Sequence, residues 1–95
     1  MAAAEHPKIS IIMPTLNAGT LLENCLASVA AQTYPRERIE IVLADAFSKD
    51  NTRDIARKYG AIVIDDNGRN MEEGIRLALR HATGELIVFV DADNE

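Results

Sequence analysis

Four short, nearly continuous apolar runs are the feature of this 95-residue sequence that most limits its fold. They consist mainly of Ile, Val and Leu and do not alternate with polar residues. That pattern is typical of strands covered on both faces, as in a parallel sheet. The runs lie at residues 9–13, 39–44, 61–64 and 86–90. We therefore predict four buried strands.

Three amphipathic segments separate these runs and predict helices. They lie at residues 20–32, 51–59 and 71–82. In the first segment, Leu22, Leu26 and Val29 recur at helical spacing. Asp50 stands where it could cap the second segment, and Gly60 stands where it could end it.

The order β-α-β-α-β-α-β predicts an α/β fold in which helices cover a parallel sheet. Parallel strands need crossover connections, which are right-handed almost without exception. The natural result is a three-layer α/β/α sandwich around a four-stranded parallel sheet. A chain of 95 residues holds one domain, with residues 1–8 as a tail. Because the chain stops directly after a strand, we expect it to be part of a larger domain.

Composition and charge narrow the functional classes. The apolar fraction of 47% argues against disorder. The net charge is −5 and the ten Lys and Arg residues are scattered, which disfavours nucleic-acid binding. The N-terminus lacks the features of a signal peptide, and no run approaches the roughly 18 apolar residues of a membrane span. We expect a cytoplasmic location, or attachment to the cytoplasmic face of a membrane through missing sequence.

The loops that follow the four strands are the candidates for a binding site, because ligands of open parallel sheets bind outside the carboxyl ends of the strands. The first loop contains Pro14, Thr15 and Asn17, and the other three contain carboxylates. We expect the four loops to meet at one edge of the sheet.

The fourth loop carries the sharpest candidate, Asp91-Ala92-Asp93. Two carboxylates at i and i+2 after an apolar strand can converge on one hard cation. Two close anions in such surroundings are costly without a cationic partner. A divalent ion held there could bind a diphosphate and stabilise its charge as it departs. The alternative is that both aspartates are solvated loop residues.

The second loop begins with Asp45, directly after a buried strand, where a carboxylate can accept hydrogen bonds from a ligand. Asp50 and Thr52 look more like helix-start residues. Ser48 is compatible with either role.

In the third loop, Arg69 offers a planar donor fork suited to phosphate or carboxylate. A surface arginine paired with Asp65 or Asp66 is the alternative.

Four stretches of the chain together resemble family 2 glycosyltransferases, whose fold is called GT-A. The similarity runs from about Ile9 to Asn94. The order and spacing of the stretches are more specific than any one of them. The stretches are Ile11-Ile12-Met13-Pro14-Thr15-Leu16-Asn17, Cys25 to Pro35, Asp45-Ala46-Phe47-Ser48-Lys49-Asp50-Asn51-Thr52, and Gly84-Glu85-Leu86 through Asp93.

The resemblance implies a truncated, Rossmann-like GT-A domain that binds a UDP- or GDP-sugar. It implies that Pro14, Thr15 and Asn17 lie near the nucleotide. It also implies that Asp45 contacts the base and that Arg69 approaches the nucleotide or its phosphates.

For the metal and the reaction, the resemblance implies that Asp91 lies by the ribose and sugar. Asp93, together with Asp91, would ligate Mg²⁺ or Mn²⁺ bridging the diphosphate. The implied reaction transfers the sugar to an acceptor hydroxyl with inversion at the anomeric carbon.

Two departures from the family's pattern bear on activity. Ala46 and Phe47 replace small glycines of the base-binding loop. Inversion needs a carboxylate to deprotonate the acceptor, and after Asp93 only Glu95 is available. We therefore assign no catalytic residue within these 95 residues and expect them to bind a nucleotide without efficient transfer.

Other functions remain to be weighed against transfer. A non-catalytic nucleotide-binding or assembly module would have the same fold. A sugar-phosphate nucleotidyltransferase would need glycines after the first strand, and a receiver domain would need acidic residues there, where this chain has Met13-Pro14. An unpaired sheet edge would expose apolar surface, so we expect a homodimer more readily than a monomer.

Overall fold

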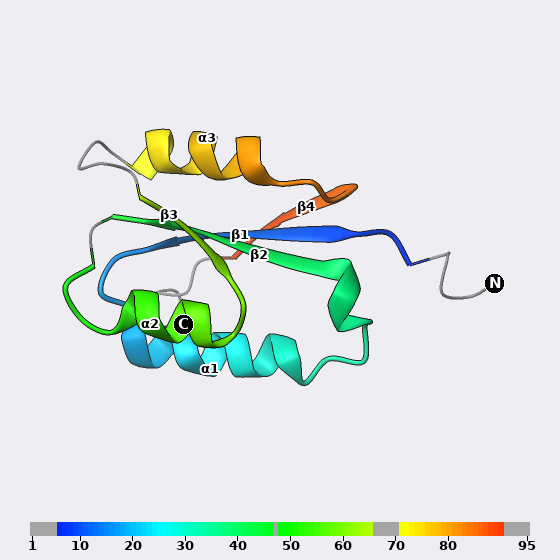
Figure 1. Cartoon of the computed structure of the whole chain (residues 1–95), viewed down its shortest axis with the longest axis horizontal. Coiled ribbons are helices and arrows are strands. Elements are labelled where there is room, and N and C mark those ends of the chain that lie inside the picture. The colour runs from blue at the N-terminus through cyan, green and yellow to red at the C-terminus, as the bar shows by residue number, and fades with distance from the viewer. Residues whose placement is uncertain (1–5, 47, 66–70, 91–95) are drawn as a thin grey trace.

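The computed structural model describes residues 6–46, 48–65 and 71–90, whose strands and helices alternate as predicted (Figure 1). None of the helices in these ranges is long and apolar enough to cross a membrane. One turn of 3₁₀ helix, η2, was not predicted from the sequence. In chain order the elements are β1 (Ile9–Thr15), α1 (Gly19–Ala30), η2 (Arg36–Arg38), β2 (Ile39–Asp45), α2 (Thr52–Lys58), β3 (Ile62–Asp65), α3 (Met71–His81) and β4 (Leu86–Phe89).

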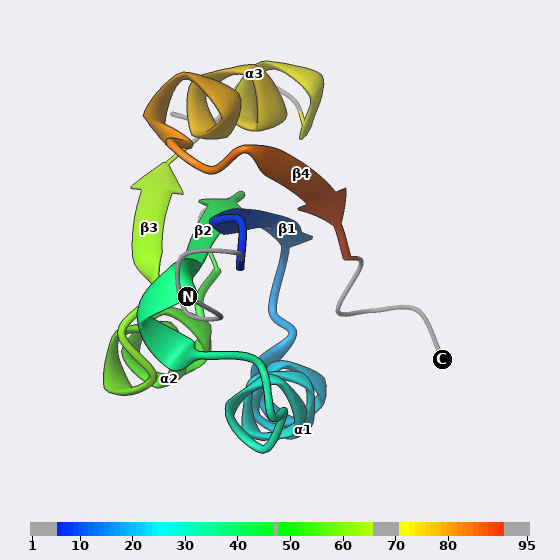
Figure 2. The same ribbon diagram turned by 90° about the vertical axis from the view of Figure 1, so that its right-hand side faces the viewer.

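The four strands form one parallel sheet in the order β3-β2-β1-β4. Helices α1 and α2 lie on one face of the sheet and α3 on the other (Figures 1 and 2). The three-layer α/β/α prediction is therefore confirmed. β1 and β2 are neighbours along their whole length, so their carboxyl ends meet, with Thr15 opposite Asp45 in the register.

Alternate residues of β1 supply two separate cores. Ile11 and Met13 pack with Leu22 and Leu26 of α1 in the larger core, between the sheet and helices α1 and α2. Ile12 packs in a smaller core with Ala78 of α3. Because successive side chains of a strand point to opposite faces, one apolar run serves both layers.

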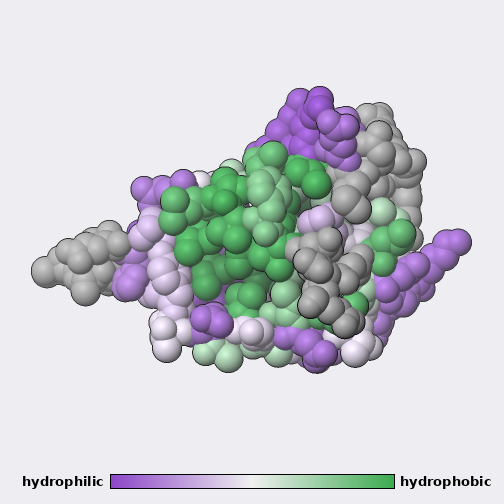
Figure 3. All heavy atoms as spheres, turned by 180° about the vertical axis from the view of Figure 1, so that it is seen from behind, coloured by the Kyte–Doolittle hydropathy of each residue, from purple (hydrophilic) through white to green (hydrophobic). Residues whose placement is uncertain are grey.

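β4 departs from the prediction that every strand is covered on both faces. Leu86, Ile87, Val88 and Phe89 are 50%, 40%, 41% and 57% exposed. The register with β1 places Leu86 and Val88 on the face that carries Ile11, and the other two on the α3 face. The described helices pack mainly against β1, β2 and β3, so both faces of β4 stay open. Figure 3 shows the resulting hydrophobic area.

Several predicted boundaries move by one or two residues, and two of these shifts bear on the site. β1 continues through Pro14 to Thr15, although the predicted strand ended at residue 13. The missing N–H of Pro14 is tolerated because the described pairing of β1 with β4 has already ended at Ile12. The residue before the first turn of α2 is Asn51, one residue after Asp50, but Asn51 makes no side-chain cap and the Asp50 carboxylate accepts the Thr52 N–H. Gly60 does end α2, with a φ of 80°.

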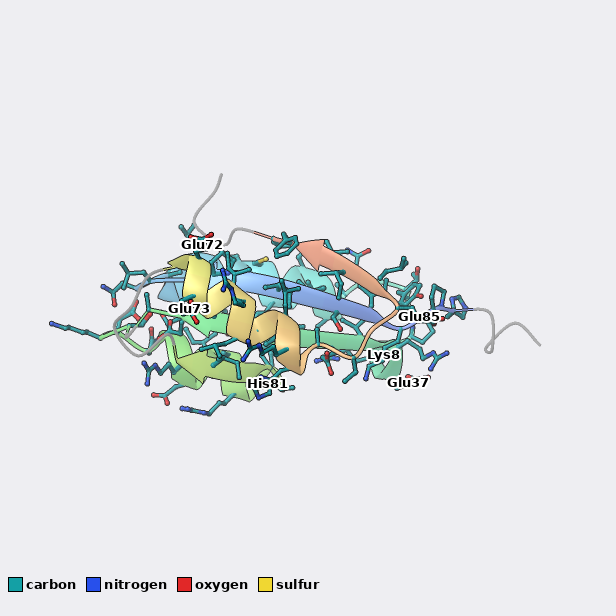
Figure 4. All side chains as sticks on the ribbon, turned by 90° about the horizontal axis from the view of Figure 1, so that it is seen from above. Lys8, Glu37, Glu72, Glu73, His81 and Glu85 are labelled. Atoms are coloured by element: carbon teal, nitrogen blue, oxygen red, sulfur yellow. The ribbon has the colours of Figure 1, made fainter. Side chains whose placement is uncertain are left out.

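At the opposite edge, where the strands begin, the Glu40 carboxylate joins three segments. It accepts hydrogen bonds from the Ser10 hydroxyl at 2.8 Å and from the Thr83 N–H at 2.9 Å, and it pairs with the Lys8 ammonium at 3.6 Å. The Lys8 N–H in turn donates to Glu85, which is at the same end of the molecule (Figure 4). These contacts tie the connection between α3 and β4 to the start of β1.

Candidate functional site

Two loops at the carboxyl edge of the sheet are joined by hydrogen bonds. One is the β1–α1 turn, residues 16–18, and the other is the β2–α2 loop, residues 46–51. The Asn17 N–H donates to the Ser48 hydroxyl at 2.8 Å, and the Lys49 N–H donates to the Asn17 side-chain oxygen at 2.7 Å. The structure therefore brings together two segments that the sequence separates by about 30 residues.

Asn17 has a backbone conformation that few side chains accept. Its φ is 50°, and among the described residues it is the one non-glycine residue with a positive φ. Asn tolerates this left-handed region better than most residues because its short polar side chain can bond locally. Here the side-chain oxygen bonds to Lys49 of the facing loop instead. The Asn17 side chain thus both permits the turn and holds the loop.

The start of α1 is also tied to the start of α2. The Ala18 N–H donates to the Thr52 hydroxyl at 3.0 Å, and the Gly19 N–H donates to the Asp50 carboxylate at 3.2 Å. Asp50 accepts from both the N–H and the hydroxyl of Thr52, and these bonds hold the pKa of Asp50 below its usual value. Asp50 and Thr52 therefore have the structural, helix-start role expected from the sequence, extended across two helices.

Asp45, the last residue of β2, is the centre of this region. Its side chain is fully buried. One carboxylate oxygen, Oδ1, accepts from the Thr15 hydroxyl at 2.7 Å and from the Ser48 hydroxyl at 2.5 Å. The other, Oδ2, accepts from the Ser48 N–H at 2.9 Å and from the Arg53 Nε at 2.8 Å. Four donors match the roughly four lone-pair sites of a carboxylate.

The charge of Asp45 is stabilised by these donors. Burial by itself raises the pKa of Asp45, but the hydrogen bonds from Ser48, Arg53 and Thr15 outweigh burial and hold its pKa below the ordinary value. Asp45 is therefore an ionised carboxylate at the end of a central strand, held by protein donors on both oxygens.

The predicted site residues fall into two groups. Thr15, Asn17 and Asp45 meet at this edge, and Pro14 is the half-buried strand residue directly before Thr15. The other predicted residues lie outside the residues that the structure describes. They are Arg69, Asp91 and Asp93.

Arg53 is the site residue that sequence reasoning missed. It lies in the first turn of α2, where a cation is disfavoured by the helix dipole. A basic residue at that position is a weak signal that it has an anionic partner. The sequence could not show that this partner is Asp45, eight residues earlier.

The family comparison agrees with this fold and this arrangement of loops. The model of "Glycosyl transferase family 2" matches residues 10–95. The chain belongs to this family. Among curated relatives of this family 2 chain, a poly(ribitol-phosphate) beta-glucosyltransferase from Bacillus spizizenii is 36% identical over 94 residues, which cover 92% of this chain and 15% of that protein.

Two solved structures share the fold of this family 2 chain. The mannosyltransferase PcManGT from Pyrobaculum calidifontis, in complex with GDP-Man and Mn²⁺, is 33% identical with a TM-score of 0.82, covering 96% of this chain and 29% of that one. TarS 1-349 of S. aureus, in complex with UDP, is 33% identical with a TM-score of 0.82, covering 90% and 27%. These similarities confirm the GT-A prediction.

The family 2 chain is short beside its relatives. It spans between 15% and 36% of the length of curated relatives that it matches.

Proposed function

We propose that this chain is the donor-binding part of an enzyme that transfers a sugar from a nucleotide-diphosphate sugar to an acceptor hydroxyl, with a divalent metal and with inversion. The observation that carries the proposal is the buried, ionised Asp45 at the junction of the β1–α1 and β2–α2 loops. It lies in a family 2 chain whose structural neighbours are complexes with GDP-Man and Mn²⁺ or with UDP.

In this proposal the described residues bind the nucleotide. Asp45 accepts an N–H of the base, and Thr15, whose hydroxyl already bonds Asp45, lies beside it. Asn17 holds the two loops together through Lys49, and Pro14 ends the apolar stretch below them. The donor is a UDP- or GDP-sugar.

The phosphate and metal end of the site rests on the sequence. Arg69 is proposed to approach the phosphates and Asp91 the ribose and sugar. Asp93 and Asp91 supply carboxylate oxygens, the donors that Mg²⁺ and Mn²⁺ take, and Asp93 is the proposed principal ligand. Such an ion, when bound, would neutralise the diphosphate charge as it leaves.

No described carboxylate of this region is a suitable general base. Asp45 and Asp50 both accept hydrogen bonds from protein donors, and the pKa of each lies below its usual value. A base of low pKa deprotonates an acceptor hydroxyl poorly. We therefore propose that residues 1–95 bind a donor nucleotide without turning it over. Turnover comparable to that of a full-length relative would overturn this point.

The engaged carboxylates also favour a second candidate, a non-catalytic nucleotide-binding or assembly module of the same fold. The two functions differ in a longer protein that contains this chain. An enzyme would release sugar or product from its donor, whereas a module would bind the nucleotide and leave the donor intact.

The open edge of the sheet supports a further element of the proposal, self-association. β4 exposes apolar side chains on both faces, which favours pairing of two copies. Light scattering at high concentration tests this, and a monomer would contradict it.

The primary test is calorimetric titration of the 95-residue chain with UDP and with GDP, each with and without Mn²⁺. The proposal expects one of the two nucleotides to bind more tightly when Mn²⁺ is present, which also identifies the base. Absence of binding in all four titrations would refute donor binding by these residues.

A further inference from the structure

We infer that Arg53 is a positioning residue for the nucleotide base: it anchors one oxygen of Asp45 so that the other is presented to the ligand. The inference rests on the proposed function and extends it to a residue outside the motifs that indicated it. It concerns recognition of the nucleotide base, not of the phosphates.

The two oxygens of Asp45 have different kinds of donor. Oδ2 is held by a backbone N–H, from Ser48, and by the Arg53 Nε at 2.8 Å. Oδ1 is held by two hydroxyls, from Thr15 and Ser48. A backbone N–H and a guanidinium have fixed donor directions, whereas a hydroxyl can rotate about its C–O bond and turn to another acceptor.

This difference decides which oxygen a base can reach. All four acceptor positions of Asp45 are occupied, so a ligand N–H must replace one donor. Replacing Arg53 or the Ser48 N–H would break an ion pair or take the acceptor from a partly buried backbone N–H, and both are costly. Rotating the Thr15 or Ser48 hydroxyl costs far less. Oδ1 is therefore the oxygen offered to the base, and Arg53 fixes the plane of the carboxylate.

The surrounding charges make Arg53 important to Asp45. Within the described residues, Arg53 is the cation in direct contact with Asp45, and its side chain is 26% exposed. The neighbouring charges are Lys49 and Asp50 in the β2–α2 loop and Asp54 in α2. The hydrogen bond from Arg53 is one of those that hold the pKa of Asp45 below its ordinary value.

The position of Arg53 in α2 supports a role beyond helix formation. A cation in the first turn of a helix opposes the helix dipole, and α2 has only seven residues. Arg57 is in the last turn of the same helix, where a cation is favourable, and it is exposed. Arg57 is therefore a matched control for Arg53.

The experiment compares wild type, Arg53→Gln, Arg53→Lys and Arg57→Gln for binding of UDP, UMP, GDP and GMP in the presence of Mn²⁺, across a range of pH. Arg53→Gln should weaken the binding of the preferred nucleoside diphosphate and of its monophosphate by the same factor, about tenfold, since Arg53 acts at the base. Arg53→Lys should recover part of the loss, because it keeps the charge without the planar fork. Arg57→Gln should bind as wild type does.

The pH profile separates positioning from a general loss of structure. Base binding requires ionised Asp45, so affinity falls as pH drops through the pKa of Asp45. Without Arg53 that pKa rises, and the fall should move to higher pH. Carboxyl-carbon NMR titration of Asp45 in the same variants measures this shift directly and needs no nucleotide. Circular dichroism checks that each variant is folded.

Three results would count against the inference. If Arg53→Gln binds as tightly as wild type with the same pH profile, Arg53 does not position Asp45, and the proposed function is untouched. A loss confined to the diphosphate would make Arg53 a phosphate ligand instead. If wild type binds none of the four nucleotides, the proposed function fails for these residues and the inference fails with it.

Discussion

The N–H of Gly84, before β4, donates to the hydroxyl of Ser10 in β1 at 2.8 Å, and the two backbones touch. A β-carbon on Gly84 would lie 2.6 Å from the Ser10 backbone nitrogen and 2.9 Å from the Ile9 carbonyl carbon. These two atoms form one peptide bond of β1, and this bond cannot move aside without disturbing the pairing of β1 with β4.

Gly84→Ala should therefore destabilise the chain by about 2 kcal/mol. Gly60→Ala is the comparison, because its nearest neighbour would be a side-chain nitrogen of Arg36 at 3.6 Å and only its φ of 80° is unfavourable. That variant should lose about 1 kcal/mol. Urea unfolding measures both, and an equal loss in the two variants would show that the contact with Ser10 does not matter.

Asp45→Asn should destabilise the chain by about 3 kcal/mol. Whichever way the new amide is turned, its NH₂ group would face donors that now bond a carboxylate oxygen, and Arg53 would lose the charge of this partner. The folded pKa of Asp45 is depressed. Its contribution to stability is therefore complete above the unfolded pKa of about 3.9 and is lost as pH falls through the lower, folded value.

Urea unfolding of wild type and Asp45→Asn at a series of pH values checks this sign. The difference in the free energy of unfolding between wild type and Asp45→Asn should narrow below about pH 4. Glu23, Glu40 and Asp50 also have lowered pKa values, so the stability of Asp45→Asn still falls in part as the pH is lowered. A gap that stays constant down to the acid transition would contradict the role assigned to the Asp45 charge.

Asn17 offers a way to separate backbone strain from a hydrogen bond. Asn17→Ala should cost about 2 kcal/mol, because it places a β-carbon without a polar group at a φ of 50° and removes the acceptor of the Lys49 N–H. Asn17→Gly relieves the strain but not the lost acceptor, so it should cost about half as much. Thermal unfolding compares them; a glycine variant less stable than the alanine variant would contradict the strain.

The apolar strand β4 should govern self-association. Val88→Lys places a charge in the middle of the open strand and should shift the chain toward monomer in light scattering. Ile62→Lys is matched, since Ile62 is also 41% exposed but lies on β3, at the other edge of the sheet. If both variants lower the molar mass measured by light scattering equally, β4 is not the contact between the two copies.

Asp93→Ala should remove the Mn²⁺-dependent part of nucleotide affinity, because a carboxylate ligand of the proposed ion is lost. Excess chelator should do the same to wild type. Asp54→Ala, which removes an exposed carboxylate from α2, is the control and should keep the metal dependence. Metal-dependent binding that survives in Asp93→Ala would rule out Asp93 as the principal ligand.

The sequence by itself determined the order of the elements and the parallel sheet. Runs such as residues 39–44 and the helical spacing of Leu22, Leu26 and Val29 are local patterns, and each depends only on the repeat of its own element. The carboxyl ends of parallel strands share one edge, so the placement of Thr15 and Asp45 at that edge also followed from the pattern. The family motifs predicted the GT-A fold.

Only the tertiary structure decided which groups meet. The two pairs of donors on Asp45, the bond from Lys49 to Asn17 and the pairing of Arg53 depend on side-chain directions between segments that are distant in sequence. β4 shows the converse. Its apolar run matches that of a covered strand, but coverage depends on where the helices pack, and the described helices pack over the other three strands. Periodicity reports what an element can bury, whereas its neighbours decide what it does bury.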